Sequence, residues 1–143
     1  MVQALWLQNF ISVYSDLGVG NLTSLQQVYH REIEFSDPLH RVDGLDELMN
    51  YFDSLYTHIE ECTFHIDSVF SCDNQAAIYW TMMFCHPKLN GGKQIVVEGH
   101  SHLVERDNKV VMHRDYLDVG SMLYEHIPLL GKAVKAVKKR AIR

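Results

Sequence analysis

The first part of the chain has the hydrophobic spacing of helices. In residues 3–17, apolar side chains recur in steps that place them on one side of a helix. Asn21 is a suitable N-cap for a second, short helix over about 22–30. The clearest helical pattern begins at Asp43 or Gly44 and continues to Ile59. The apolar positions of the first helix are Leu5, Phe10, Val13, Tyr14 and Leu17.

The rest of the chain predicts strands. Between the second and third helices, "EIEFSDP" (32–38) indicates a strand that its proline ends, because proline cannot donate to a sheet. Apolar and polar residues then alternate after residue 60, which is typical of strands with one buried face. Segregated helices and strands favour an α+β fold, with the long helix packed on one face of a curved sheet. The later strands are expected over 62–72, 76–86, 94–105 and 110–119, with turns rich in Asp, Asn and Gly between them.

Alternation along these strands predicts which side chains face the space between sheet and helices. We assign the bulkier apolar face of each strand to the interior. The inner face then carries Ile78, Trp80, Met82 and Phe84, then Val97, Gly99, Ser101 and Leu103, and finally Val111, His113, Asp115 and Leu117. The outer face carries Glu98, His100 and His102, then Val110, Met112, Arg114, Tyr116 and Asp118.

Composition excludes several classes of protein. Hydrophobic residues make up 47% of the 143, so the chain is not expected to be disordered, and no apolar run is long enough to span a membrane. The N-terminus has neither a basic leader nor a small-residue cleavage site, so we expect mature structure there. Three cysteines without a C-x-x-C motif predict reduced, buried thiols and a cytoplasmic protein.

The charge is unevenly distributed. The net charge is −5, yet residues 132–143 carry six basic side chains and no acidic one. The other 131 residues hold seven basic and 18 acidic side chains and therefore sum to −11. A body of this charge lacks the basic face that nucleic acid requires, so we expect no nucleic-acid partner.

Two carboxylates are the candidates for chemistry. Asp37 ends the first strand and Asp115 shares its face with His113, while Tyr14 approaches from the first helix. A carboxylate walled by Trp and Phe loses solvation, which raises its pKa toward the range useful for general acid–base catalysis. Structural alternatives remain open: Asp37 as a turn cap, Asp115 as a buried partner of His113, and Tyr14 as a core tyrosine.

A metal site is the weaker candidate. His100 and His102 form an H-x-H pair on one strand face, with Glu98 beside them, and two such nitrogens can share a metal ion. That face is expected to point outward or into a subunit interface. We therefore predict no metal and no cofactor.

The order helix, helix, "IEFSDP", glycine-started helix and strand meander ending in "VVMHRDYLD" resembles the ketosteroid isomerase/SnoaL-like branch of the NTF2-like superfamily, over about residues 5–118. The resemblance implies an α+β cone, in which a curved, mixed and mainly antiparallel sheet wraps around the long helix and N-terminal helices close the pocket. It also implies that Asp37 matches the general base of ketosteroid isomerases and Tyr14 their oxyanion donor. Ser101 stands where they have a protonated aspartic acid.

Other relatives imply other chemistry. SnoaL-like cyclases use an acid/base aspartate on a late strand, which Asp115 resembles, with His113 on the same face. Limonene epoxide hydrolase uses an Asp-Arg-Asp set, whereas Arg114 is predicted to face outward here. Because a serine lacks the acidity of a carboxylic acid, Ser101 argues against steroid isomerisation itself.

We therefore expect a SnoaL-like domain over residues 1–125. It would bind an apolar carbonyl-containing or lipid-like substrate and act on it by cofactor-free isomerase, cyclase or dehydratase chemistry. Asp37, Asp115, Tyr14 and His113 are the expected catalytic residues. The alternative is a non-catalytic binding module. A homodimer through the outer sheet face is expected in either case. The expected substrate-binding residues are Ser101, Leu103, Trp80, Met82, Phe84, Leu117 and Phe52.

The C-terminal segment, residues 126–143, reads as a basic amphipathic helix. Such a helix can lie on an anionic membrane surface, pack on a partner subunit or remain solvated. Peripheral membrane contact is accordingly one of the expectations for residues 128–143.

Overall fold

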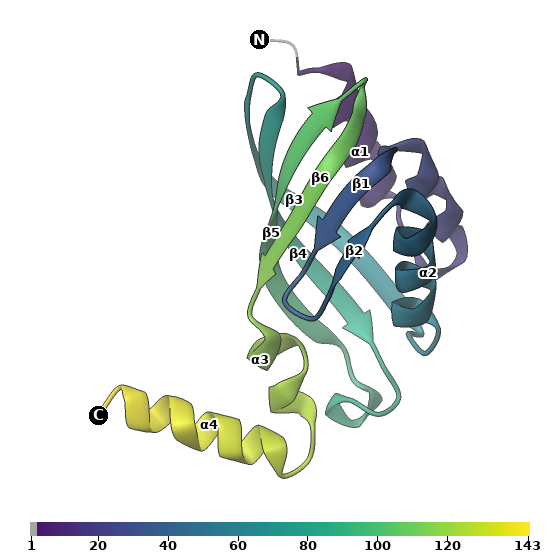
Figure 1. Ribbon diagram of the computed structural model, residues 1–143. Coiled ribbons are helices and arrows are strands. Elements are labelled where there is room, and N and C mark those ends of the chain that lie inside the picture. Colours follow the sequence, from purple (N-terminus) through teal and green to yellow (C-terminus); the bar gives the residue numbers. More distant parts are fainter. Residues whose placement is uncertain (1–2) are drawn as a thin grey trace.

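The computed structural model describes residues 3–143 as helices packed against a single sheet (Figure 1). The predicted α+β fold is confirmed. Its elements are α1 (Leu5–Ser15), the 3-10 helix η1 (Val19–Gln27), β1 (Tyr29–Ser36), β2 (Arg41–Asp43), α2 (Leu45–Tyr56), β3 (Glu61–Cys72), β4 (Gln75–Cys85), η2 (Asn90–Gly92), β5 (Ile95–Arg106), β6 (Lys109–Leu117), α3 (Val119–Met122), η3 (Tyr124–His126) and α4 (Leu130–Ala141).

The six strands form one mixed sheet in the order β2-β1-β6-β5-β4-β3. Only β1 and β6 pair in parallel, so the first strand is inserted beside the last one, and every other neighbour is antiparallel. The register sets Ser101 between Ile78 on β4 and Asp115 on β6. Because directly paired residues point to the same face of a sheet, these three side chains share the inner face.

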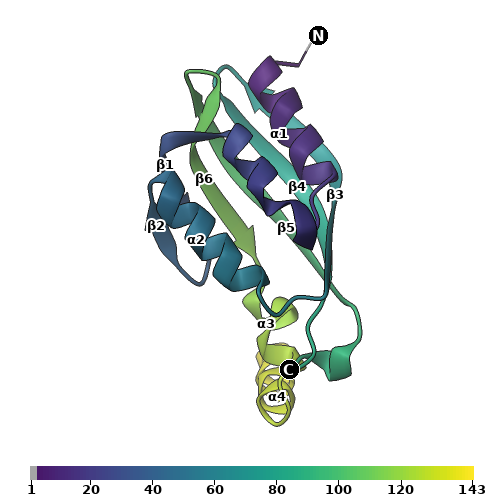
Figure 2. The same cartoon turned by 90° about the vertical axis from the view of Figure 1, so that its right-hand side faces the viewer.

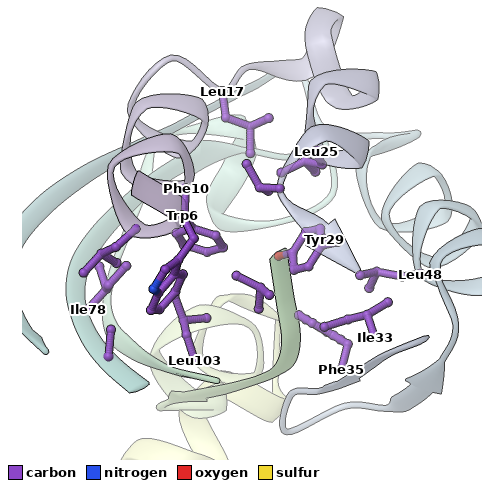
Figure 3. Close-up of a cluster of buried hydrophobic side chains, with 14 of the residues drawn as sticks. Trp6, Phe10, Leu17, Leu25, Tyr29, Ile33, Phe35, Leu48, Ile78 and Leu103 are labelled. Carbon is purple, nitrogen blue, oxygen red and sulfur yellow. The ribbon is translucent and has the colours of Figure 1, made fainter. Parts of the chain in front are cut away.

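The helices α1, η1 and α2 all lie on one face of the sheet, and the other face is left uncovered by helices (Figures 1 and 2). Their apolar sides and the inner face of the strands form the main core (Figure 3). Within it, Leu7, Ile33, Leu48 and Leu103 are fully buried. This core fills the end of the molecule near α1.

The apolar face predicted for α1 is partly wrong. Leu5 is 59% exposed, whereas Trp6 and Leu7 are buried together with Phe10. A stripe through positions 6, 7 and 10 fits the helical period as well as the predicted one. Sequence spacing therefore left two rotations of this helix open, and packing of Trp6 against the sheet selected one of them.

The second helix is also shifted from its prediction. The structure has a 3-10 helix over Val19–Gln27, and Tyr29 already belongs to β1, where it pairs with Val110. Pairing with β6 is a long-range interaction that the local pattern of 22–30 does not encode. The third helix begins where predicted, with Gly44 as its N-cap at φ of 91°, a conformation that glycine adopts readily, but it ends at Tyr56, three residues before the predicted Ile59.

A β-bulge corrects the face assignment at the start of β6. Val104 pairs with Met112 but Glu105 pairs with Val110, which leaves Val111 as the extra residue. One extra residue reverses the alternation. Val110 is consequently buried in the core and Val111 is not, the opposite of the sequence assignment, whereas the inner positions His113 and Asp115 keep theirs.

The cysteines are free, as predicted, but they are not all buried. Cys62 lies in the core, Cys85 is partly buried, and Cys72 is exposed because it stands at the end of β3, beside the turn to β4. No helix within residues 3–143 is long and apolar enough to cross a membrane.

Candidate active site

A cavity of about 350 Å³ lies between α2, the inner face of the sheet and α3. This volume is within the range of small-molecule sites. It lies at the opposite end of the sheet from the beginning of α1, and no α1 or η1 residue contributes to its lining in the described part of the chain. The lining residues are Phe35, Asp37, Pro38, Leu39, Phe52, Leu55, Tyr56, Ile59, Phe64, Trp80, Met82, Phe84, His86, Leu89, Asp115, Leu117, Met122 and Leu123.

The walls of this cavity are largely apolar. Of the predicted binding residues, Trp80, Met82 and Phe84 come from β4, Phe52 from α2 and Leu117 from β6, and all five lie in the lining. Alternation on β4 explains the first three, because residues two apart share a face. An apolar ligand would therefore contact side chains from the strands on one side and from α2 on the other.

Asp115 is one of the few polar groups in the cavity wall, and it is firmly held. Its Oδ1 accepts a hydrogen bond from Ser101 Oγ at 2.5 Å and lies 2.6 Å from His113 Nε2. The side chain of His113 is only 1% exposed, while that of Asp115 is 19% exposed. Oδ2 has no hydrogen-bond partner within residues 3–143, yet it is not buried. The carboxylate is thus anchored through one oxygen and offers the other.

His113 is itself connected to a buried chain of hydroxyls. Its Nδ1 lies 2.7 Å from the Tyr29 hydroxyl, which is 2.5 Å from the Tyr14 hydroxyl. A neutral His113 with its proton on Nε2 satisfies this chain: Tyr14 donates to Tyr29, Tyr29 donates to Nδ1, and Nε2 donates to Asp115. Burial raises the pKa of Tyr14 and of Tyr29 well above the usual value, so both stay protonated.

Trp80 helps to orient the same carboxylate through Ser101. Its indole Nε1 donates a hydrogen bond to Ser101 Oγ at 2.9 Å, and the Ser101 hydroxyl donates in turn to Asp115. The indole fits because Gly99, paired with Trp80 across the strands, has no side chain. A Cβ on Gly99 would lie 2.5 Å from Trp80 Cη2. Trp80 therefore forms part of the cavity wall and also orients Ser101.

Asp37 also lines the cavity, but it is engaged in the turn between β1 and β2. Its Oδ1 accepts from the backbone N–H groups of Leu39 and His40, at 2.8 and 2.9 Å. Its Oδ2 accepts from the Tyr51 hydroxyl at 2.6 Å, and its own N–H donates to the His40 carbonyl. One carboxylate oxygen of Asp37 therefore caps this turn and the other ties it to α2, as expected if Asp37 has a structural role.

Four of the predicted site residues lie behind the cavity surface. Tyr14, Ser101 and His113 belong to the hydrogen-bonded chain behind Asp115, and Leu103 is fully buried in the main core. None of the four is part of the lining. The strand alternation correctly identified their face, but it carries no information on depth, and these residues lie nearer to the α1 end of the sheet than the cavity does.

Sequence analysis missed Tyr56. It lines the cavity from the end of α2, and its hydroxyl accepts only a long contact from the Cys62 thiol, at 3.9 Å. Its hydroxyl proton has no acceptor in the described part of the chain. Burial is the main cause that raises its pKa well above the usual value, and the charge of Asp115 adds to the effect. The apolar stripe of the helix contained Tyr56, but nothing in the pattern separated it from Phe52.

The H-x-H pair lies on the outer face. The ring of His100 stacks between Tyr79 and Tyr116, with centroids 5.0 and 4.8 Å away, and His102 Nε2 lies 2.8 Å from Gln75 Oε1. Arg114 is on this face too, above the ring of Tyr116. None of these side chains belongs to the cavity that Asp115 and Asp37 share.

One family model matches most of the chain. A family model described as a SnoaL-like domain matches residues 10–113. The matched segment includes Asp37 and His113 and ends two residues before Asp115. A search of curated proteins finds no match.

Solved structures with similar folds cover nearly the whole chain. A candidate SnoaL-like polyketide cyclase from Jannaschia sp. CCS1 has a TM-score of 0.75 at 9% identity, over 90% of this chain and 98% of that one. An NTF2-like protein of unknown function from Burkholderia pseudomallei K96243 has a TM-score of 0.74 at 13% identity, over 88% and 99%. A hypothetical protein with a ketosteroid isomerase-like fold from Catenulispora acidiphila DSM 44928, in complex with trimethylamine, has a TM-score of 0.74 at 12% identity, over 89% and 96%. At these identities the likeness concerns the fold, and the predicted NTF2-like cone is confirmed, except that its N-terminal helices cover the main core and do not line the cavity.

Proposed function

The chain belongs to the SnoaL-like domain family, and from this premise we propose that it binds an apolar, carbonyl-containing small molecule and moves a proton on it with Asp115. The observation that carries this proposal is the different hydrogen bonding of the two oxygens of that carboxylate. One oxygen is fixed by Ser101 and His113, and the other is free at the wall of an apolar cavity. A base held in this way can approach a substrate without first being desolvated or reoriented.

The proposed step is a proton transfer at carbon. Oδ2 of Asp115 takes a proton from the carbon next to the substrate carbonyl, and the electrons of that C–H bond move toward the carbonyl oxygen to form an enolate. The protonated carboxyl then returns the proton to carbon, at the same or another position. Isomerisation, cyclisation and dehydration all begin with this step, and none of them requires a cofactor.

His113 is a positioning residue in this proposal. It faces Asp115 and not the ligand, and its orientation is fixed by Tyr29 on the far side. Asp37 is assigned to the turn, since three hydrogen bonds already use its two oxygens. Of the two carboxylates that the sequence offered as the base, we favour Asp115.

Tyr56 is the proposed donor to the enolate oxygen. Tyr14, which the family resemblance suggested for this role, is bonded to Tyr29 behind the cavity. Tyr56 lines the cavity, stays protonated because burial raises its pKa, and has a hydroxyl proton without an acceptor in residues 3–143. A preorganised donor of this kind stabilises charge that develops during reaction.

The first test follows exchange of the α-hydrogens of 2-tetralone, a small bicyclic ketone, for deuterium in D2O by NMR. We expect the protein to accelerate exchange, and Asp115→Asn to lower the protein-dependent rate by about 10² to 10⁴, the usual contribution of a general base. Asp37→Asn is the matched control, expected to keep most of the rate. Unchanged exchange in Asp115→Asn, or a loss confined to Asp37→Asn, would contradict the assignment.

A second variant tests the oxyanion donor. Tyr56→Phe removes only the hydroxyl, so the helix and the cavity wall remain. We expect a rate lower by about 10² for 2-tetralone exchange, as for other single oxyanion donors. Tyr51→Phe, on the same helix, serves as the control because its hydroxyl binds Asp37. Equal rates in Tyr56→Phe and the unaltered protein would remove Tyr56 from the mechanism.

A non-catalytic binding module is the second candidate, and one observation favours it. The hydroxyls of Ser101 and Tyr14, two of the expected donors, are used inside the protein. If 2-tetralone binds, as measured by quenching of tryptophan fluorescence, to which Trp6 and Trp80 both contribute, but the unaltered protein exchanges its α-hydrogens no faster than buffer does, then the pocket binds without catalysis.

A further inference from the structure

The helix α4 is the largest feature that the pocket does not use. It projects from the end of the sheet where the cavity lies, and it packs against η3 and not against the sheet (Figures 1 and 2). It contains most of the basic C-terminal segment defined above. Its fixed place on the molecule and its free surfaces indicate an interaction site.

One side of α4 is fixed to the segment that precedes it. Lys138 Nζ lies 3.0 Å from Glu125 and 3.5 Å from Asp118. Gly131 is buried against the Glu125 backbone so closely that a Cβ would meet the Glu125 carbonyl oxygen at 2.4 Å. At 100° per residue, Gly131 and Lys138 are on the same side of the helix. That side therefore faces η3.

A second side of α4 is an exposed apolar stripe. Leu130 is 43% exposed and Val137 is 67% exposed, although both are large hydrophobic side chains. Residues 130, 133, 134, 137 and 141 recur at three- and four-residue steps, so Leu130, Ala133, Val134, Val137 and Ala141 form one continuous stripe. Leu129 and Ile142 flank the helix outside this stripe and are 80% and 86% exposed.

The side opposite this stripe is basic. Lys132, Lys135 and Lys139 are exposed and have no salt bridge to any residue of 3–143. Arg140 and Arg143 add two further charges. The rest of the molecule sums to −11. An anionic surface would therefore attract this helix and repel the remainder of the protein, which fixes the orientation of the encounter.

We propose that α4 docks on the surface of an anionic lipid bilayer. The apolar stripe would enter the boundary between headgroups and acyl chains, while the lysines contact anionic headgroups, as in other interfacial helices. A second copy of this chain fits the surface less well, because it would cover the apolar stripe but leave Lys132, Lys135 and Lys139 of both copies without an anionic partner. The exposed lysines and the exposed apolar stripe together therefore favour an anionic lipid surface as the partner of α4.

Docking through α4 would bring the cavity close to the bilayer. Met122 and Leu123 line the cavity and stand immediately before η3, on which α4 is packed. This consequence rests on the proposed function, since it supposes that the cavity takes up an apolar ligand. The docking itself does not, and it can be measured without any ligand.

The test is co-sedimentation of the full chain with vesicles. We expect binding to vesicles of equal parts phosphatidylcholine and phosphatidylserine, and almost none to phosphatidylcholine alone. Raising the salt from about 0.05 M to about 0.5 M should release the protein, because salt screens exposed charges. Equal binding to both kinds of vesicle, or binding that salt does not change, would overturn the proposal.

Variants separate the two halves of the surface. Replacing Lys132, Lys135 and Lys139 with Gln should weaken binding by about two orders of magnitude, at roughly fivefold per basic residue. The matched control neutralises Arg31, Arg41 and Arg106, three exposed arginines of the sheet, and should bind as before. If both triple variants lose binding equally, the attraction belongs to net charge and not to α4.

The apolar half is tested by Leu130→Ser with Val137→Ser, against Leu5→Ser, which alters an equally exposed leucine on α1. The first variant should lose most binding at unchanged charge, and the control should lose none. Far-ultraviolet circular dichroism confirms that each variant is folded. If the stripe variant instead keeps its vesicle binding but changes the mass of the protein in solution, the stripe is a contact between subunits or proteins and the proposal is wrong.

Discussion

Tyr29 is the central residue of the buried hydrogen-bond chain that ends at Asp115. Its hydroxyl contacts Tyr14 on one side and His113 on the other, and its ring stacks on His113 at 24° with centroids 5.8 Å apart. The chain joins α1, β1 and β6, three elements distant in sequence. Tyr29 and His113 are fully buried, so their polar groups must find partners inside the protein. The orientation of the candidate base is thereby tied to the packing of the core.

We expect Tyr29→Phe to destabilise the protein by about 2 to 4 kcal/mol, because it leaves two buried groups, His113 Nδ1 and the Tyr14 hydroxyl, without a partner. Urea unfolding measures the change. Tyr51→Phe is the comparison: Asp37 keeps its two backbone donors there, so the loss should be about 0.5 to 1.5 kcal/mol. Equal losses in the two variants would mean that the chain behind Asp115 is not a tightly satisfied network.

At the scale of elements, the pairing of β4 with β5 positions the wall that β4 presents to the cavity. Trp80 lies above Gly99, its partner across the two strands, and reaches Ser101 two residues further along β5. Bulk on one strand is matched by the absence of a side chain on the other. This pairing fixes where the cavity ends, because the indole separates it from Ser101 and Leu103.

Gly99→Ala is expected to cost about 1 to 3 kcal/mol of stability, since a Cβ would meet the Trp80 ring at 2.5 Å and the Tyr116 carbonyl at 2.8 Å. The Trp80 fluorescence should also shift as the indole is displaced. Gly20→Ala is the matched control, because a Cβ there meets nothing within 4 Å. Thermal unfolding of both variants measures the difference. A Gly99 variant as stable as the control would show that Trp80 moves without cost.

At the scale of the whole molecule, the two faces of the sheet have different surroundings. Helices cover the inner face, while the outer face carries a row of rings in which Phe70, Tyr79, His100 and Tyr116 contact one another in turn. Phe70 is 64% exposed. Glu98 and Arg114, of opposite charge, share this face. This face can therefore meet a copy of itself with Glu98 of one copy opposite Arg114 of the other.

We propose that two copies pair through this outer face, and expect the mass of a dimer in light scattering at micromolar concentration. Tyr79→Glu with Tyr116→Glu should give monomers, because four carboxylates would then meet within the interface. The variant with Gln at 132, 135 and 139 is the control and should remain a dimer. A monomeric unaltered protein, or a dimer that survives the tyrosine changes, would exclude this interface.

The sequence by itself determined the fold class, the inner faces of β4 and β5 and of β6 from His113 onward, and the apolar character of the pocket. These follow from residue spacing, because the period of a helix or strand is a local property. Tertiary structure alone decided the rest. The rotation of α1 toward Trp6, the bulge that buries Val110 and the depth of Tyr14 and Leu103 depend on contacts between residues far apart in the chain. Likewise, only the folded protein could commit Asp37 to a turn and leave one oxygen of Asp115 free, since hydrogen-bond partners are set by distance in space.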